Sequence, residues 1–167
     1  DASALVEVLD GPPELLVVAL KGPALARAAD NIRRLGLAER VRLIESDVYA
    51  ALEDAPDQPR RYDLVVSNPP YVPNASMDEL PAEYLHEPEM ALRAGDDGLD
   101  IVRKLLSGAP EHLTPGGFLL LEVGEAAPQT QALLGDVASI WLEFEHGGEG
   151  VVLLDRAACL KWREENQ

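Results

Sequence analysis

Cysteine, basic residues and long apolar runs are all scarce in this sequence, and each shortage excludes a class of protein. The one cysteine, Cys159, has no partner for an internal disulfide, and no Cys and His spacing resembles a zinc site. No stretch approaches the roughly 20 consecutive apolar residues that span a bilayer, and the start lacks the pattern of a signal peptide. We therefore expect a cytoplasmic protein with no metal site and no membrane contact, in which Cys159 is a partly buried residue of the tail.

The shortage of positive charge bears on the kind of partner. Lys and Arg total 14 against 30 Asp and Glu, which gives a formal net charge of −16. Such a balance opposes tight, sequence-independent contact with a phosphate backbone. A nucleic-acid substrate is therefore disfavoured, although a local basic patch would still permit one.

What is present is the pattern of one α/β domain over residues 1–167, with 47% hydrophobic residues and no repeat or linker to divide it. We expect strands at 15–20, 41–48, 63–67, 118–123, 140–145 and 151–154, and helices at 25–35, 99–106 and 126–134. Pro110 and Pro115-Gly116-Gly117 should end the second helix. The alternation predicts a mostly parallel sheet, and the last two strands should form an antiparallel pair.

Asn68-Pro69-Pro70-Tyr71 directly follows the apolar strand at 63–67, where ligands bind in such folds. The two prolines have fixed φ and no N–H, so the carbonyls of Asn68 and Pro69 are held rigidly outward, and Asn68 adds a side-chain carbonyl. Two acceptors can hold both N–H groups of a planar NH₂ while Tyr71 lies against its plane. The alternative interpretation is a turn that merely ends the strand.

The chemistry that suits this motif is transfer of a group to a planar nitrogen. An amide nitrogen is a poor nucleophile because its lone pair is delocalised, so the reaction needs a reactive electrophile, which a methyl sulfonium supplies. No G-x-S-x-G nucleophile elbow is present, and such a transfer requires no covalently modified side chain.

The Asn68 to Tyr71 motif resembles the substrate loop of the glutamine-amide methyltransferases, which act on release factors and ribosomal proteins. Residues 80–89 and 94–100 match the stretch that follows this loop in the family. Residues 141–151 look like the ending of the branch that methylates the third protein of the large ribosomal subunit.

This resemblance implies a Rossmann-like class I methyltransferase fold with S-adenosylmethionine as its cofactor. It implies transfer of the methyl group to the side-chain amide nitrogen of a glutamine in a ribosomal protein. Asn68 and Pro69 would be catalytic, and the whole Asn68 to Tyr71 segment would bind the target glutamine, with Asn68 also facing the cofactor. The alternatives are a release-factor methyltransferase, an adenine-amino methyltransferase on nucleic acid, and a non-catalytic homologue that no longer binds the cofactor.

A second stretch, Glu45-Ser46-Asp47-Val48, resembles the family position that contacts the adenine of the cofactor. The resemblance makes Asp47 and Val48 cofactor-binding residues, since a carboxylate can accept from the exocyclic NH₂. A turn or N-cap role for Asp47 is the equal alternative. His112 and His146 are expected at the surface or in turns rather than as ligands.

The sequence departs from the family near its start. The family places a glycine-rich G-x-G-x-x turn after its first strand, and none is present here. Where the family has an acidic residue for the ribose hydroxyls, this sequence reads Ala19-Leu20-Lys21, and Lys21 cannot accept a hydrogen bond. We therefore expect a catalytic domain that lacks its first strand and glycine-rich loop and is truncated on its N-terminal side.

Overall fold

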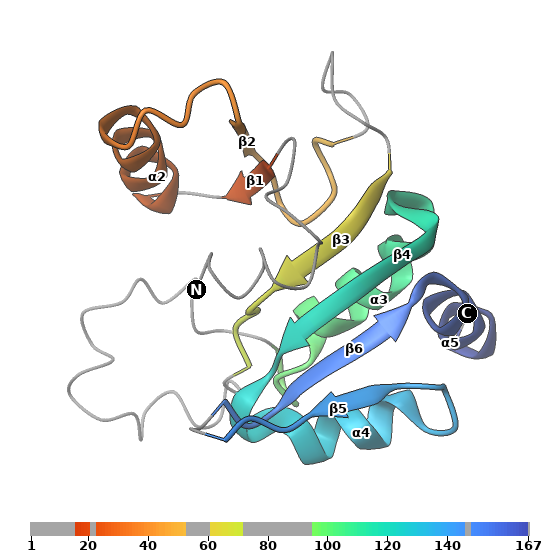
Figure 1. Cartoon of the computed structure of the whole chain (residues 1–167). Coiled ribbons are helices and arrows are strands. Elements are labelled where there is room, and N and C mark those ends of the chain that lie inside the picture. The colour runs from red at the N-terminus through yellow and green to blue at the C-terminus, as the bar shows by residue number, and fades with distance from the viewer. Residues whose placement is uncertain (1–15, 21–22, 53–60, 72–94, 146–147, 167) are drawn as a thin grey trace. The chain divides into compact units, whose positions relative to one another are not determined.

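A computed structural model describes residues 16–20, 23–52, 61–71, 95–145 and 148–166 (Figure 1). The chain divides into two compact units, Asp1–Gln58 and Pro59–Gln167, and each is described by itself. The single domain expected over residues 1–167 stays a prediction. Among the residues described, no helix combines the length and the apolar character that crossing a bilayer requires.

The N-terminal unit contains a strand–helix–strand motif. Strand β1 (Leu16–Leu20) leads into helix α2 (Pro23–Arg34) and then into strand β2 (Val41–Glu45). The two strands pair in parallel, from Leu16 opposite Val41 to Leu20 opposite Glu45. Parallel pairing requires such a crossover connection, and the proline at the first helical position has the φ that a helix start needs. Strand β2 ends three residues before the predicted Val48, because the chain turns at Ser46.

The C-terminal unit is built on a four-stranded sheet in the order β3-β4-β6-β5. Its strands are β3 (Tyr62–Ser67), β4 (Leu113–Glu122), β5 (Ile140–Leu142) and β6 (Val151–Asp155). Strand β3 pairs in parallel with β4, while β6 pairs antiparallel with both β4 and β5. Three strands therefore run in one direction and β6 opposes them, which confirms the predicted α/β fold with a mostly parallel sheet and an antiparallel C-terminal strand.

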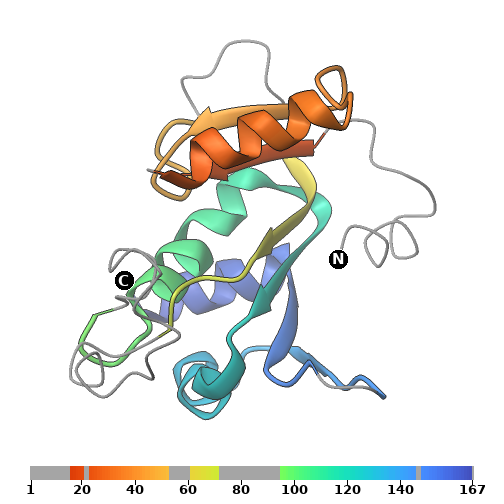
Figure 2. The same ribbon diagram turned by 90° about the vertical axis from the view of Figure 1, so that its left-hand side faces the viewer.

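Helices α3 (Asp100–His112) and α5 (Arg156–Asn166) cover one face of this sheet. They pack against each other and against β4, and Figures 1 and 2 both show them on the same side of that strand. Inward residues alternate with outward ones along β4, as the period of a strand requires. The fully buried side chains of this layer come from α3, β4, β6 and α5: Val102, Leu106, Leu119, Leu121, Val152, Leu154 and Cys159.

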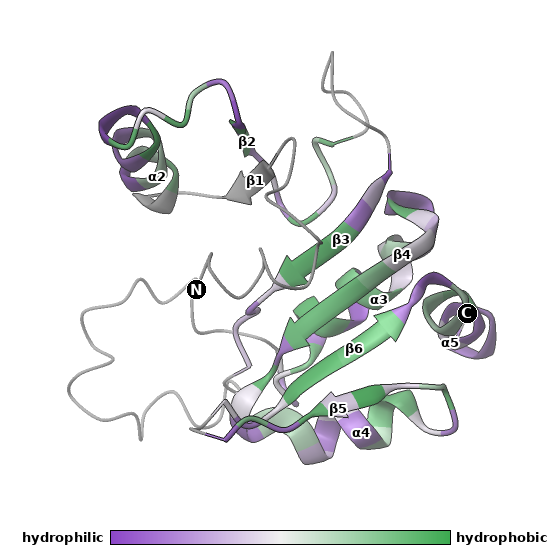
Figure 3. Cartoon of the chain, viewed as in Figure 1, coloured by the Kyte–Doolittle hydropathy of each residue, from purple (hydrophilic) through white to green (hydrophobic). Residues whose placement is uncertain are grey.

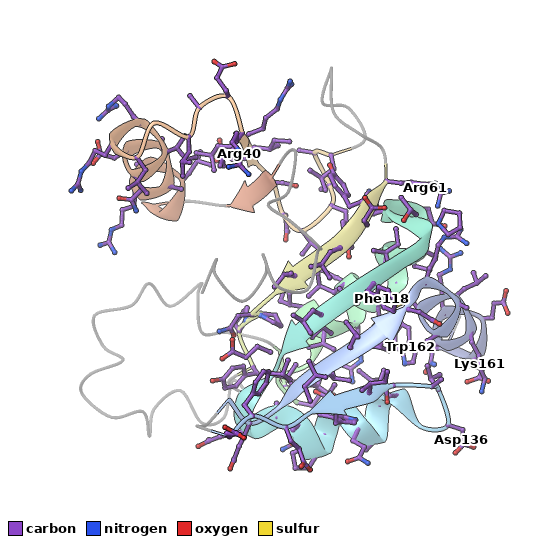
Figure 4. The ribbon with its side chains drawn as sticks, viewed as in Figure 1. Arg40, Arg61, Phe118, Asp136, Lys161 and Trp162 are labelled. Carbon is purple, nitrogen blue, oxygen red and sulfur yellow. The ribbon has the colours of Figure 1, made fainter. Side chains whose placement is uncertain are left out.

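The opposite face of the sheet also carries apolar residues, because β3, β4 and β6 are hydrophobic along most of their length, as the colouring of Figure 3 shows. Register places Val66, Phe118 and Ile140 on this face, and they are 50%, 41% and 59% exposed. Phe118 projects from β4 toward the viewer in Figure 4. The two faces of β4 therefore differ sharply in burial, although both carry hydrophobic residues.

Helix α3 does not end at Pro110 as the sequence predicted, because it continues to His112. A proline in the last turn removes one N–H from the helix ladder and crowds the carbonyl four residues before it, but few residues of the helix follow it. The Pro110 carbonyl is held from outside the helix, since Arg61 Nη1 donates to it at 3.1 Å and Arg156 Nε at 2.8 Å. These two arginines connect the end of α3 to the starts of β3 and α5.

Strand β4 also begins earlier than predicted, at Leu113 instead of Phe118. Tyr62 pairs with Leu113, and an irregularity in register lets the pairing resume between Leu64 and Phe118. Thr114 Oγ1 donates to Asp63 Oδ1 at 2.9 Å across the two strands. The Pro-Gly-Gly segment that suggested a turn is therefore accommodated inside the strand as a local distortion.

Helix α5 was not predicted, and its discovery corrects the description of Cys159. That side chain is fully buried in the helix rather than partly buried in a tail. Asp155 Oδ1 accepts the N–H of Ala158 at 2.7 Å, which is the N-cap signal that marks the helix start. Trp162 Nε1 donates to the Leu133 carbonyl at 3.0 Å and fixes the helix to the end of α4 (Ala127–Leu134), as Figure 4 lets the reader follow.

Candidate functional site

The Asn68 to Tyr71 segment leaves the carboxyl end of β3, where the sequence predicted it. Ser67, the last residue of β3, is paired with Leu121 near the end of β4, so the segment lies at the edge of the sheet where both parallel strands finish. Asn68 is exposed, Pro69 is buried, and Pro70 is half-buried. A buried proline between an exposed amide and a second proline keeps the local backbone rigid while the Asn68 side-chain carbonyl stays accessible.

Tyr71 closes this segment and lies against Gly124, which comes two residues after the end of β4. A Cβ atom added to Gly124 would lie 2.9 Å from the Tyr71 hydroxyl oxygen and 3.0 Å from Cζ, so a side chain there would require the tyrosine ring to shift. The sequence singled out Tyr71 but not Gly124. A glycine placed just beyond a strand that ends at the same edge was the available signal.

The second predicted site, Asp47 and Val48, lies in the N-terminal unit just after β2. Ser46 is buried, and its Oγ donates to the Val48 carbonyl at 2.8 Å and accepts from the Ala51 N–H at 3.0 Å. Val48 has a φ of +54°, a conformation that is strained for a β-branched residue. Asp47 is exposed at the tip of this loop.

This loop suits the adenine of S-adenosylmethionine, the cofactor that the family resemblance implies. An exposed carboxylate at the carboxyl end of a parallel strand is an acceptor for an exocyclic amine such as that of adenine. The expected lack of a first strand and glycine-rich loop concerns residues 1–15, which lie outside the described residues, as does Lys21.

Asp97 lies in the family-like stretch before α3, and its environment gives it a structural role. The Arg103 guanidinium is the main cause that lowers the pKa of Asp97 to about 2, and the Leu99 N–H, which donates to Oδ1 at 3.1 Å, lowers it further. Burial acts in the opposite direction. Asp97 is therefore a stable anion that ties the start of α3 to the next turn of that helix.

The histidines offer no ligand site in the part of the chain that the structure describes. His112, which was expected at the surface, is only 6% exposed, and its Nδ1 lies 2.9 Å from the Gly108 carbonyl oxygen. His146 and residues 80–94 of the family-like stretch lie outside the described residues. Within residues that are described, no three His, Cys, Asp or Glu side chains gather as a metal site requires.

Sequence comparison identifies proteins that are related to this chain. The chain is 46% identical over 138 residues to the ribosomal protein uL3 glutamine methyltransferase of Xanthomonas campestris pv. campestris. The aligned residues are 83% of this chain and 43% of that protein. It is 50% identical over 132 residues to the protein of the same name from Xylella fastidiosa, with 79% and 40% covered. The chain is related to the uL3 glutamine methyltransferases. The names of these relatives agree with the family and the branch that the motifs indicated.

A third relative of the same name, from Neisseria meningitidis serogroup A, is 46% identical over 131 residues, with 78% of this chain and 41% of that protein covered. The chain thus spans less than half the length of the curated relatives it matches. No protein-family model matches the chain.

Solved structures with a similar course of the backbone are more distant. A precorrin 8w decarboxylase of Methanobacterium thermoautotrophicum has a TM-score of 0.44 at 16% identity, over 89% of this chain and 72% of that one. A glycopeptide N-methyltransferase complexed with S-adenosyl-L-homocysteine has a TM-score of 0.37 at 19% identity, over 83% and 43%.

Proposed function

We propose that this chain is the catalytic portion of an S-adenosylmethionine-dependent methyltransferase that modifies the side-chain amide nitrogen of a glutamine in ribosomal protein uL3. The observation that carries the proposal is the rigid Asn68 to Tyr71 segment at the carboxyl end of β3, with Pro69 buried and Asn68 exposed. The names of the relatives support the choice of substrate. A protein that modifies a ribosomal protein would work in the cytoplasm.

The chemistry follows from what the segment offers to an amide. The Asn68 side-chain carbonyl and the Pro69 backbone carbonyl are acceptors, and a glutamine NH₂ has two donors in one plane. Holding both donors fixes that plane, so that the face of the nitrogen points in one direction. Positioning is the main contribution available, because an amide nitrogen is too weak a nucleophile to react without it. The amide nitrogen loses one proton to water or a passing base after it gains the methyl group, and neither Asn68 nor Pro69 gains or loses a proton.

The Asp47–Val48 turn is the second segment for which the family resemblance implies contact with the cofactor. S-adenosylmethionine supplies an electrophilic methyl sulfonium when it is bound. Asp47 would accept from the adenine amine, and the buried Ser46 hydroxyl would keep the Asp47–Val48 turn in shape. Asn68 would face both the methyl donor and the acceptor nitrogen. The net charge of −16 favours a protein acceptor over a nucleic acid in the same role.

Methyl transfer to purified uL3 tests this proposal. The chain is incubated with S-adenosylmethionine and either uL3 or ribosomal RNA, and fragmentation mass spectrometry locates the added methyl group. We expect one glutamine side chain to be modified, and no modification when that residue is replaced by glutamate, which has no amide nitrogen. Methylation of adenine in ribosomal RNA instead of protein would contradict the proposal and favour the adenine-amino alternative.

A further inference from the structure

Tyr71 and Gly124 are brought together by the pairing of two strands. Tyr71 follows β3 and Gly124 follows β4, and these strands run in parallel with Ser67 opposite Leu121. Both residues therefore lie beyond the same edge of the sheet. The end of the tyrosine ring rests on the Gly124 α-carbon so closely that a Cβ there would meet Oη at 2.9 Å, Cζ at 3.0 Å and Cε1 at 3.4 Å.

Gly150 holds the same glycine by a contact between backbones. The Val123 N–H donates to the Gly150 carbonyl at 2.8 Å, just before β6 begins. A Cβ on Gly150 would lie 2.6 Å from the Gly124 nitrogen and 2.8 Å from its α-carbon. Both glycines have positive φ, +48° at Gly124 and +74° at Gly150, which other residues adopt only with strain. The segments that follow β3 and β4 thus meet the segment that precedes β6. At this point a Cβ on Gly150 would collide with backbone atoms, and a Cβ on Gly124 would push against the Tyr71 ring.

We propose that Gly124 and Gly150 are positioning residues that form a seat for the Tyr71 ring, so that the ring presents a fixed surface to the side chain of a protein substrate. This inference rests on the proposed function, in which Tyr71 lies against the plane of the glutamine amide. The seat acts through Tyr71 and touches no reacting atom. Its rigidity comes from backbone contacts, which cannot relax by changing a rotamer.

The chain provides a matched control for a test of this seat. Gly135 also has a positive φ, +56°, yet a Cβ there would meet nothing within 4 Å. Gly124→Ala and Gly135→Ala therefore both introduce backbone strain, and only the first pushes against Tyr71. The test compares each variant alone and combined with Tyr71→Ala.

We expect Gly124→Ala and Tyr71→Ala to be coupled. Once the ring is removed, the added methyl group has nothing to displace, so the double variant should melt about 2–4 °C or more above the temperature that the two separate shifts predict. Gly135→Ala and Tyr71→Ala should be additive. If Gly124→Ala alone does not fold, Tyr71→Ala should restore folding. The proposal would be overturned if the shifts in melting temperature of Gly124→Ala and Tyr71→Ala were additive, or if Tyr71→Ala did not restore folding.

Two further measurements distinguish a positioning role of Gly124 from a purely structural one. The Tyr71 ring signals in an NMR spectrum should move in Gly124→Ala and stay in place in Gly135→Ala. Binding of a glutamine-containing uL3 peptide, measured by fluorescence anisotropy, should weaken at least about tenfold in Gly124→Ala only. Unchanged ring signals would overturn the seat. Failure of the unaltered chain to bind the peptide would instead overturn the proposed function, because coupling and ring signals are measured without substrate.

Discussion

Ser46 Oγ donates a hydrogen bond to the carbonyl of Val48 at 2.8 Å, across the turn that presents Asp47. The same oxygen accepts from the Ala51 N–H at 3.0 Å, so one buried hydroxyl satisfies two backbone groups. Val48 is held at a φ of +54° in this turn. Strain of this kind costs about 1–3 kcal/mol and persists only where surrounding contacts enforce it. The hydrogen bonds of Ser46 thus hold the turn in a backbone conformation that valine disfavours.

Replacement of Ser46 by alanine should destabilise the chain. The Ala51 N–H and the Val48 carbonyl would both lose their partner, and we expect a loss of about 1–3 kcal/mol in the free energy of unfolding. Urea denaturation measures this change. Ser107→Ala, at an exposed position of α3, is the matched control and should change stability by less than about 0.5 kcal/mol. Equal effects of the two substitutions would show that the Ser46 hydroxyl does not hold the turn.

Substitutions at Val48 should reverse the usual order of alanine and glycine. Alanine normally stabilises a chain relative to glycine, because glycine loses more conformational freedom on folding. At a φ of +54° the Cβ is the source of the strain, so Val48→Gly should be more stable than Val48→Ala by about 1 kcal/mol. Both variants lose the same packing of the valine methyl groups, and the difference between them isolates the backbone. A more stable alanine variant would mean that Val48 is not strained.

Asp97 should titrate well below an ordinary aspartate. Its pKa is lowered from 3.8 to about 2, mainly by Arg103, so its contribution to stability is present above pH 4 and is lost as the pH falls toward 2. The two side chains are 49% and 40% exposed, so salt should weaken the effect. In an NMR titration of the carboxyl carbons, Arg103→Met should raise the pKa of Asp97 toward its ordinary value. Arg163→Met, which removes the partner of Glu111, should leave it unchanged.

Cys159 should be unreactive while the chain is folded. It is fully buried in α5, and burial is the main cause that raises its pKa to about 12, with Asp155 adding to it. Because the thiolate is the reactive form, modification by a chromogenic disulfide should occur only through unfolding. The labelling rate should therefore rise with urea in parallel with the unfolded fraction. Rapid labelling in the absence of urea would contradict the burial of this residue.

Local patterns were sufficient for much of the fold and for the main motif. The apolar run of β3 and the prolines that follow it placed Asn68 to Tyr71 correctly, because fixed φ angles and buried strands leave few alternatives. Helix α5 was missed because its buried residues, Ala158, Cys159 and Trp162, are few and only one is large. Pro110 was misread because the helix continues for two residues beyond it, and the Arg61 and Arg156 side chains hold its carbonyl from outside the helix.

Other features of the site depend on contacts between segments that are distant in sequence. Gly124 meets Tyr71 only because β3 and β4 pair in register, and no local pattern encodes that meeting. The positive φ of Val48 could not be predicted, because valine disfavours that conformation and Ser46 imposes it from outside. The sequence therefore predicted which residues would meet ligands, and it gave no sign of those that shape the backbone beneath them.

The most direct test of the central claim is methyl transfer to uL3 by Asn68→Ala compared with Asn31→Ala, which changes an exposed asparagine of α2. If Asn68 holds the glutamine amide, its loss should reduce the rate at least about a hundredfold, with unfolding behaviour unchanged. Asn31→Ala should retain the rate of the unaltered chain. Equal rates for both variants would contradict the assignment of Asn68 as the residue that positions the amide.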